Sequence, residues 1–225
     1  MIGHGGEPTT EPLPAENPRS MLWFASDLPN LFSLAGLMSA MTGIYFAILG
    51  IFPAAMIGLV WAVAFDWLDG RVARGMRDRT DDQRTYGGQL DSLIDVVSFG
   101  IGPAVVLLSI GGFSPWFLPG AFVALAAGVT RLSYFNTFGL AEGSTYRGLA
   151  LDNNVIILVL LFAFRGLFSA EVFAGVLYAT LMLMAVLNIA PIRTPKLGGT
   201  WYYAIIAYAV VMTVLFGWML LVPAV

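Results

Sequence analysis

Long apolar runs are the feature that most constrains this chain. A helix needs about 20 residues to cross a bilayer, and prolines at the ends of such runs are typical of helix starts and stops. Seven runs of suitable length occupy residues 29–49, 54–75, 87–111, 116–137, 152–169, 171–190 and 200–222. The sequence therefore predicts an all-α, polytopic membrane protein.

Composition supports a membrane protein and narrows its chemistry. The chain is 58% hydrophobic and 11% charged, whereas soluble domains carry about 25% charged residues. It has no cysteine and one histidine, His4, in a polar tail. Disulfides, thiolate chemistry and histidine-based metal or nucleophile sites are thus excluded. Any chemistry must therefore be carried by carboxylates, arginines, hydroxyls and backbone. The net charge of −3 is too small to imply a partner by itself, and no nucleic-acid partner is expected.

The ends of the runs predict an orientation. Residues 1–20 lack a signal-peptide pattern and are expected to form a cytosolic tail, and residues 20–28 are expected to lie in the membrane interface with Trp23 at headgroup depth. With seven alternating spans, Arg165 alone lies on one side. The basic residues on the other side are Arg19, Arg71, Arg74, Arg77, Arg79, Arg84, Arg131, Arg147, Arg193 and Lys196. The positive-inside rule makes that side cytoplasmic.

Four aspartates lie inside otherwise apolar runs, where an ionised side chain costs on the order of 3 kcal/mol and indicates function. Asp66 and Asp69 share a helix face with Gly70 and Ala73. The next run has a second acidic face, formed by Gly87, Asp91, Asp95, Ser98 and Gly102. Both faces lie toward the cytoplasmic ends of consecutive antiparallel helices, so we expect them to face each other.

Carboxylates brought together need a cation to stay ionised. Oxygen ligands without His or Cys suit Mg²⁺, Mn²⁺ or Ca²⁺, and small residues beside them let a ligand approach the backbone. Such a cluster at the inner leaflet suits a phosphoanhydride substrate. The alternative is that these residues pack helices together, which would explain the small residues but not the four acids.

Two strings carry a family resemblance. DWLDGRVAR at residues 66–74 is followed by GGQLDSLID at residues 87–95. Together they resemble the signature of the CDP-alcohol phosphotransferases, D-x2-D-G-x2-A-R followed by G-x3-D-x3-D. The spacer at 75–86 is longer than is usual in the family. Its aspartates, Asp78, Asp81 and Asp82, are interpreted as part of a solvated cytosolic loop.

The resemblance implies a six-helix core open to the cytoplasmic leaflet of the cell membrane, over residues 28–197, with 1–27 as tail and 198–225 as an extra transmembrane helix. It implies that Asp66, Asp69, Asp91 and Asp95 bind metal, and that Asp95 is also the general base. Gly70, Ala73, Arg74 and Gly87 would line the CDP pocket. Asn30 and Ser33 are placed near the nucleotide by a shorter match, and capping of a helix by Asn30 is the alternative.

Further segments resemble bacterial and archaeal phosphatidylserine synthases, namely residues 91–104, 130–136 and 193–196. Residues 146–154 depart from the pattern of that group, in a region that would touch the acceptor alcohol. Arg131 is expected either to hold a phosphate or an acceptor carboxylate, or to anchor its helix by snorkelling.

The resemblance therefore implies transfer of a phosphatidyl group from CDP-diacylglycerol to L-serine with release of CMP, with membrane lipid as partner and a homodimer as the assembly seen in the family. The alternative acceptors are an inositol phosphate, glycerol phosphate or another polar alcohol. A different class, an ion-coupled transporter, also places acids in spans, but the acids crowd two consecutive helices and no inverted repeat is visible.

Overall fold

The computed structural model describes residues 19–140, 145–195 and 198–222. The expectation for the tail before Arg19, with His4, and that for Lys196 lie outside these residues. The helices are α1 (Met21–Ala25), α2 (Leu28–Ile48), α3 (Phe52–Gly75), α4 (Asp81–Asp95), α5 (Gly102–Ile110), α6 (Leu118–Phe138), α7 (Asp152–Ala163), α8 (Ala170–Ile189) and α9 (Trp201–Leu221). The strands are β1 (Thr145–Arg147) and β2 (Arg193–Pro195).

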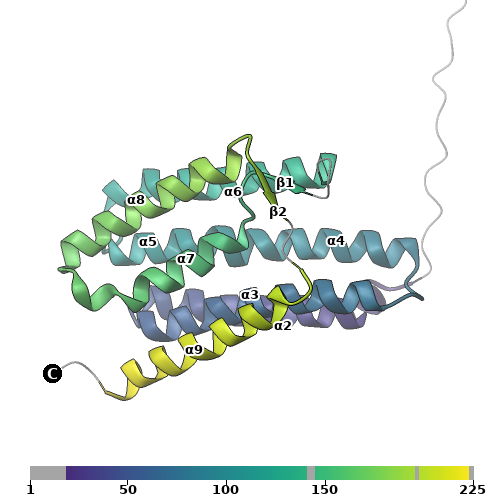
Figure 1. Cartoon of the computed structure of the whole chain (residues 1–225), viewed down its shortest axis with the longest axis horizontal. Helices are drawn as coiled ribbons and strands as arrows, with labels where there is room; N and C mark the ends of the chain where they lie inside the picture. Colours follow the sequence, from purple (N-terminus) through teal and green to yellow (C-terminus); the bar gives the residue numbers. More distant parts are fainter. Residues whose placement is uncertain (1–18, 141–144, 196–197, 223–225) are drawn as a thin grey trace, which may run out of the picture.

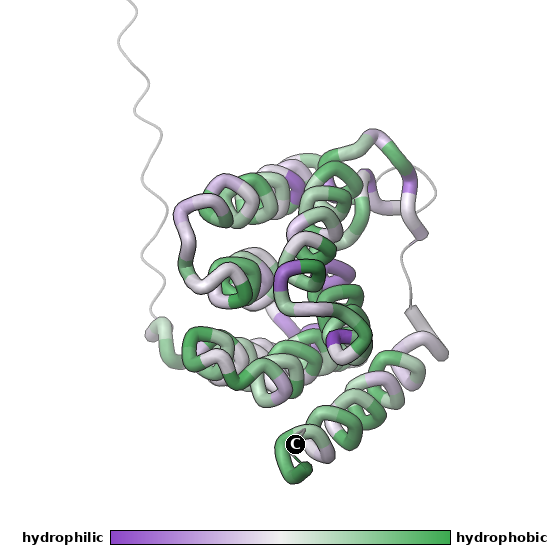
Figure 2. Tube along the Cα trace, turned by 90° about the vertical axis from the view of Figure 1, so that its left-hand side faces the viewer, coloured by the Kyte–Doolittle hydropathy of each residue, from purple (hydrophilic) through white to green (hydrophobic). Residues whose placement is uncertain are grey.

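The long helices run along the long axis of the molecule (Figure 1). Within the described ranges, six helical segments are long and apolar enough to cross a membrane. They are Leu28–Ile48, Phe52–Gly75, Asp81–Ile110, Pro115–Phe138, Ala170–Ile189 and Trp201–Leu221. Hydrophobic residues predominate over most of the bundle, with hydrophilic residues interspersed among them (Figure 2). The prediction of an all-α, polytopic membrane protein is confirmed.

The connections between helices show at which end of the bundle each arginine lies. The α3–α4 connection and the C-terminal end of α6 lie at the right of Figure 1, and the α7–α8 connection lies at the left with the C-terminal end of α9. Arg77, Arg79 and Arg131 therefore belong to the end opposite that of Arg165.

The run expected to span at 152–169 is shorter than predicted. α7 ends at Ala163, and a 3-10 turn at Arg165–Leu167 follows it. At a rise of about 1.5 Å per residue, α7 is about 18 Å long and covers only part of a bilayer. α7 begins beside α3, where the indole of Trp67 donates a hydrogen bond to Asp152, the first residue of α7.

The segment before α7 is extended, and its backbone N–H groups are hydrogen-bonded to other parts of the chain. β1 pairs with β2 in antiparallel register, with Tyr146 opposite Thr194. Gly148 N–H donates to the carbonyl of Ile192 at 2.9 Å, and Leu149 N–H donates to that of Leu187 at 2.9 Å. Backbone outside regular helices needs such partners, and here the residue before β2 and the end of α8 supply them.

The spacer at 75–86 was predicted to be a solvated loop, and that is wrong for its second half. α4 begins at Asp81, and Thr80 and Gln83 form a capping box at its start. Asp81 and Asp82 occupy the first turn, where negative charge is stabilised by the helix dipole. The extra spacer residues therefore extend α4 beyond the expected start at 87.

α4 does not continue as a regular α-helix through the run ending at 111. Residues Val96–Ile101 form a π-helical turn directly after Asp95, and Gly102 N–H donates to the carbonyl of Val97. Pro103 lacks an N–H and would crowd an α-helical carbonyl before it, so the wider turn accommodates it. Such turns are frequent at functional sites.

The helices enclose one apolar core, to which α3 contributes Met56, Leu59 and Val63, all fully buried. α9 packs along α3 on the outside of the bundle (Figure 2). Its contacts include a hydrogen bond from the indole of Trp61 to Thr213 Oγ1 at 2.9 Å.

Candidate active site

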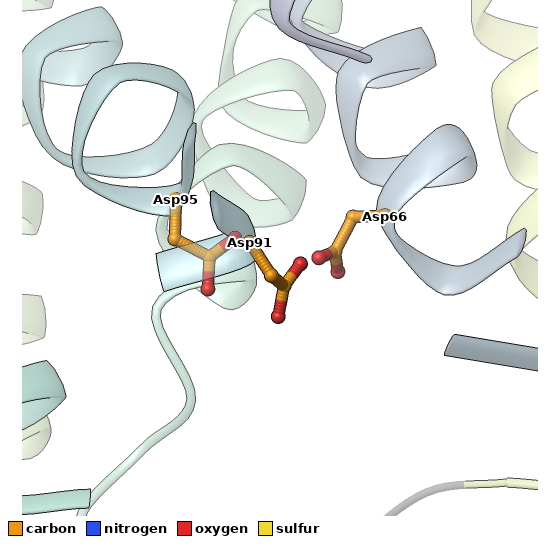
Figure 3. A group of neighbouring side chains, drawn as sticks. All are labelled: Asp66, Asp91 and Asp95. Atoms are coloured by element: carbon orange, nitrogen blue, oxygen red, sulfur yellow. The ribbon is translucent and has the colours of Figure 1, made fainter. Parts of the chain in front are cut away.

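Three of the four predicted aspartates meet between α3 and α4. Asp66, on α3, and Asp91 and Asp95, on α4, each offer a carboxylate oxygen within 4.8 Å of the others. Figure 3 shows the three side chains pointing toward one another. The spacing of four residues between Asp91 and Asp95 puts both on one face of α4, so the two helices bring the acids together. We call these three residues the carboxylate cluster.

Asp69 lies beside this cluster with a different partner. Its carboxylate accepts a short hydrogen bond from the hydroxyl of Ser33, on α2. The carbonyl oxygen of Pro29, 3.3 Å from the same hydroxyl, is the alternative acceptor. Asp69 is 7% exposed, and Ser33 thus fixes its orientation from the neighbouring helix.

The cluster opens on a cavity of about 410 Å³. All four aspartates line it, and so do residues from α6, the β1–α7 segment, β2 and the start of α9. The polar and aromatic members of this second group are Arg131, Phe135, Tyr146, Asp152, Asn153, Thr194 and Tyr202. Segments far apart in the sequence therefore form the walls opposite the signature strings.

The donor set fits a hard divalent cation. The cluster supplies only carboxylate oxygens, which suit ions such as Mg²⁺ and Mn²⁺. Asp95 Oδ1 is buried and has no hydrogen-bond partner among the described residues, and an unpaired buried carboxylate oxygen is costly unless a cation or donor reaches it. The cluster could therefore hold a metal ion.

Of the residues predicted to lie near the nucleotide, some line the cavity and others do not. Gly70 and Arg74 line the cavity, and a Cβ at Gly70 would lie 3.2 Å from Arg74 Nη1. Ala73, Gly87, Asn30 and Ser33 do not line it. A Cβ at Gly87 would instead meet Asn30 Oδ1 at 2.9 Å, so Gly87 allows α2 and α4 to approach closely.

Asn30 does not cap α2. The N-cap of α2 is Asp27, and no side chain caps that end. The Asn30 amide donates to the carbonyl of Phe24 at 2.8 Å and so secures the end of α1. Asp27 is used elsewhere, in a buried salt bridge of 2.7 Å with Arg79.

Arg131 is buried and faces the cavity. It is 7% exposed, and its guanidinium lies 5.5 Å from the ring centroid of Phe135 and 5.2 Å from that of Tyr146. Its Nε has no hydrogen-bond partner in the described part of the chain. A snorkelling side chain would extend into water, so the buried position and the free Nε favour the ligand-binding alternative. By contrast, Arg147 is exposed and donates to the hydroxyl of Tyr134.

Sequence reasoning did not single out Asp152, although it lies in the 146–154 segment that was expected to touch the acceptor. Asp152 begins α7, and its Oδ2 accepts a hydrogen bond from the indole of Trp67 at 2.8 Å. Burial raises the pKa of the neighbouring Tyr146 phenol, so that side chain stays neutral and adds no anion to the wall. The available signal was an acid at the start of an apolar run, but only the fold places Asp152 on the same cavity as Asp66.

Fold and site together define a class, a helical membrane protein with a carboxylate cluster gathered on an internal cavity. The family model for CDP-alcohol phosphatidyltransferases matches residues 26–224. The chain therefore belongs to the CDP-alcohol phosphatidyltransferase family and is an enzyme of that kind.

Curated relatives agree with this family. The chain is 33% identical over 174 residues to archaetidylserine synthase of Methanothermobacter thermautotrophicus, covering 76% of this chain and 71% of that protein. It is 28% identical over 177 residues to the CDP-diacylglycerol–serine O-phosphatidyltransferase of Helicobacter pylori, covering 75% and 71%. A Methanocaldococcus jannaschii protein with the same name is 29% identical over 160 residues, covering 71% of each chain.

Proposed function

We propose that this enzyme transfers a phosphatidyl group from CDP-diacylglycerol to the hydroxyl of L-serine and releases CMP. Relatives that cover most of the chain carry serine in their names. The observation that carries the proposal is the cavity itself, because it combines the carboxylate cluster with the buried cation of Arg131. Serine needs both, a base for its hydroxyl and a cation for its carboxylate.

In this proposal Asp95 is the general base. It takes the proton of the serine hydroxyl while that oxygen forms a bond to the lipid-side phosphorus. The phosphoanhydride bond breaks, and its electron pair leaves with CMP. A carboxylate acting in this way contributes roughly 10²–10⁴-fold. The unpartnered Oδ1 of Asp95 leaves an acceptor position free for that proton.

Asp66, Asp69, Asp91 and Asp95 are the proposed metal-binding residues. When bound, a Mg²⁺ or Mn²⁺ ion neutralises negative charge on the diphosphate. Ser33 then acts through Asp69, whose carboxylate it orients.

Gly70 and Arg74 are proposed to contact the CDP moiety, since both line the cavity beside the cluster. For Ala73, Gly87 and Asn30 we propose a supporting role, because they lie behind that wall. Arg131 is proposed to bind the serine carboxylate through its guanidinium.

The placement of the enzyme follows from its charges. We propose that it lies in the cell membrane with the α3–α4 connection and the cavity entrance facing the cytoplasm, as the basic residues favour. We also propose that α9 supplements a six-helix core ending at residue 197, and that the protein can form homodimers.

An acceptor panel tests the proposed function. Purified protein in lipid would be supplied with CDP-diacylglycerol, Mn²⁺ and one acceptor at a time: L-serine, glycerol 3-phosphate, inositol phosphate or ethanolamine. We expect CMP release to be fastest with L-serine. Release that depends on another acceptor, with none on serine, would refute the acceptor but keep the reaction class.

A further inference from the structure

We propose that Asp152 receives the ammonium group of the acceptor, so that Asp152 and Arg131 together select a zwitterionic amino alcohol. This inference rests on the proposed function and extends it to an acceptor-binding residue outside the signature strings. It starts from two oppositely charged side chains that line the cavity without a salt bridge between them.

The two opposite charges line one cavity and attract each other across it, but they are not in salt-bridge contact. Arg131 and Asp152 both line it, yet no salt bridge joins them in the part of the chain that the structure describes. Arg131 is more than nine-tenths buried, with Nε unpartnered. A buried guanidinium without a full set of acceptors is costly, so a ligand carboxylate would stabilise this wall.

Asp152 is held in place but not saturated. Its Oδ2 accepts from Trp67 Nε1 at 2.8 Å, and its Oδ1 accepts from the backbone N–H and the side-chain amide of Asn153 at 3.0 and 3.1 Å. An ionised carboxylate offers about four acceptor positions. These donors therefore orient the group and leave capacity for one further donor from the cavity.

The position of Asp152 separates it from the metal-binding acids. The group of carboxylates whose oxygens lie within 4.8 Å of one another contains Asp66, Asp91 and Asp95 but not Asp152. Asp152 is nevertheless tied to the cluster, because its partner Trp67 directly follows Asp66 on α3. An ammonium bound at Asp152 would thus lie near the cluster without occupying it.

This arrangement matches the substituents of serine. The hydroxyl and ammonium groups of serine sit on adjacent carbons, and the carboxylate shares a carbon with the ammonium. The carboxylate cluster, Asp152 and Arg131 provide a base, an anion and a cation on walls of the same cavity. Three different contacts would favour serine over alcohols that lack either charge, because unmatched polar groups in the site would remain unpaired.

The test compares Asp152→Asn with a matched control in the full-length enzyme. The substitution keeps shape and an acceptor for Trp67 but removes the charge. Asp78→Asn makes the same change at an exposed residue in the α3–α4 connection and should leave kinetics unchanged. Initial rates of CMP release would give KM for L-serine, KM for CDP-diacylglycerol, and kcat/KM for 3-hydroxypropionate, which is serine without the ammonium.

We expect Asp152→Asn to raise the KM for serine by about tenfold or more, as loss of a charge-assisted hydrogen bond predicts. The KM for CDP-diacylglycerol should stay within about twofold, and the preference for serine over 3-hydroxypropionate should shrink by the same factor as serine binding. An unchanged KM for serine, or an equal loss with 3-hydroxypropionate, would overturn the inference.

Two further outcomes are also decisive. If Asp152→Asn does not fold, Trp67→Phe is tested instead. It keeps the charge of Asp152 but removes the hydrogen bond that orients its carboxylate. A raised KM for serine in Trp67→Phe then supports the inference, and an unchanged KM overturns it. If the wild-type enzyme does not use serine, the proposed function fails first. The inference then survives only if the true acceptor carries a cationic amine whose KM rises in Asp152→Asn, and a neutral or anionic acceptor overturns it.

Discussion

At the scale of single residues, the charged side chains inside apolar spans allowed the candidate site to be predicted from sequence. An isolated acid at the centre of a span costs on the order of 3 kcal/mol, so the four aspartates were predicted as candidate site residues from sequence alone, and all four line the cavity. Their partners were not predictable. Ser33 binds Asp69 across 36 positions of sequence, and Asp152 reaches Trp67 across 85. Such pairs depend on how helices pack, which periodicity does not reveal.

Asp66→Asn, Asp69→Asn and Asp91→Asn should each abolish turnover. The amide keeps the shape but removes the charge that the proposed cation requires, and a neutral side chain inserts into a membrane more easily. CMP release and the amount of protein in the membrane fraction would be measured together. Wild-type activity in one variant would remove that residue from the metal site.

Asp95→Asn should behave differently from the other three. Its Oδ1 is the buried oxygen without a partner, so we assign to it the proton of the acceptor. The variant should still bind CDP-diacylglycerol and metal while turnover falls by roughly 10²–10⁴-fold. Lipid binding and CMP release would be titrated on one sample. If binding is lost together with rate, Asp95 is mainly a structural metal ligand and the assignment as base is wrong.

At the scale of elements, the apolar runs predicted most helices well. α2, α3, α8 and α9 begin and end within two residues of the expected bounds, since hydrophobic length and proline define them. The departures occur beside the cavity. α4 extends into the polar spacer, the π-helical turn follows Asp95, and α7 begins only after the β1–β2 pairing. Tertiary contacts decide these features.

Gly148, in the segment before α7, should not tolerate a side chain. Its φ is +72°, and a Cβ there would lie 1.9 Å from the carbonyl oxygen of Asn188. Gly148→Ala must therefore displace backbone of α8, or the segment that carries Asp152. We expect a lower Tm and a large loss of activity.

Gly166 offers the matched control for this substitution. A Cβ at Gly166 would meet nothing within 4 Å, and its φ is not positive. Gly166→Ala should preserve both Tm and activity. Equal behaviour of the two alanine variants would show that the close approach at Gly148 does not support the cavity.

At the scale of the whole molecule, the distribution of arginines predicts which end faces the cytoplasm. The chain has no cysteine, so a single introduced thiol reports one position. Thr80 caps α4, and the exposed Asp78 is the better site for a label. Asp78→Cys should react with an impermeant reagent only from the cytoplasmic side, and Gly166→Cys only from the other. The reverse pattern would invert the proposed topology.

The most direct measurement quantifies both products of the reaction in the absence and in the presence of a divalent metal ion. Purified enzyme in metal-free buffer would receive CDP-diacylglycerol and L-serine, and CMP and phosphatidylserine would be quantified before and after addition of Mn²⁺ or Mg²⁺. The proposed function predicts no product without metal, and equal amounts of CMP and phosphatidylserine with it. Full activity in metal-free buffer, or CMP without phosphatidylserine, would contradict it.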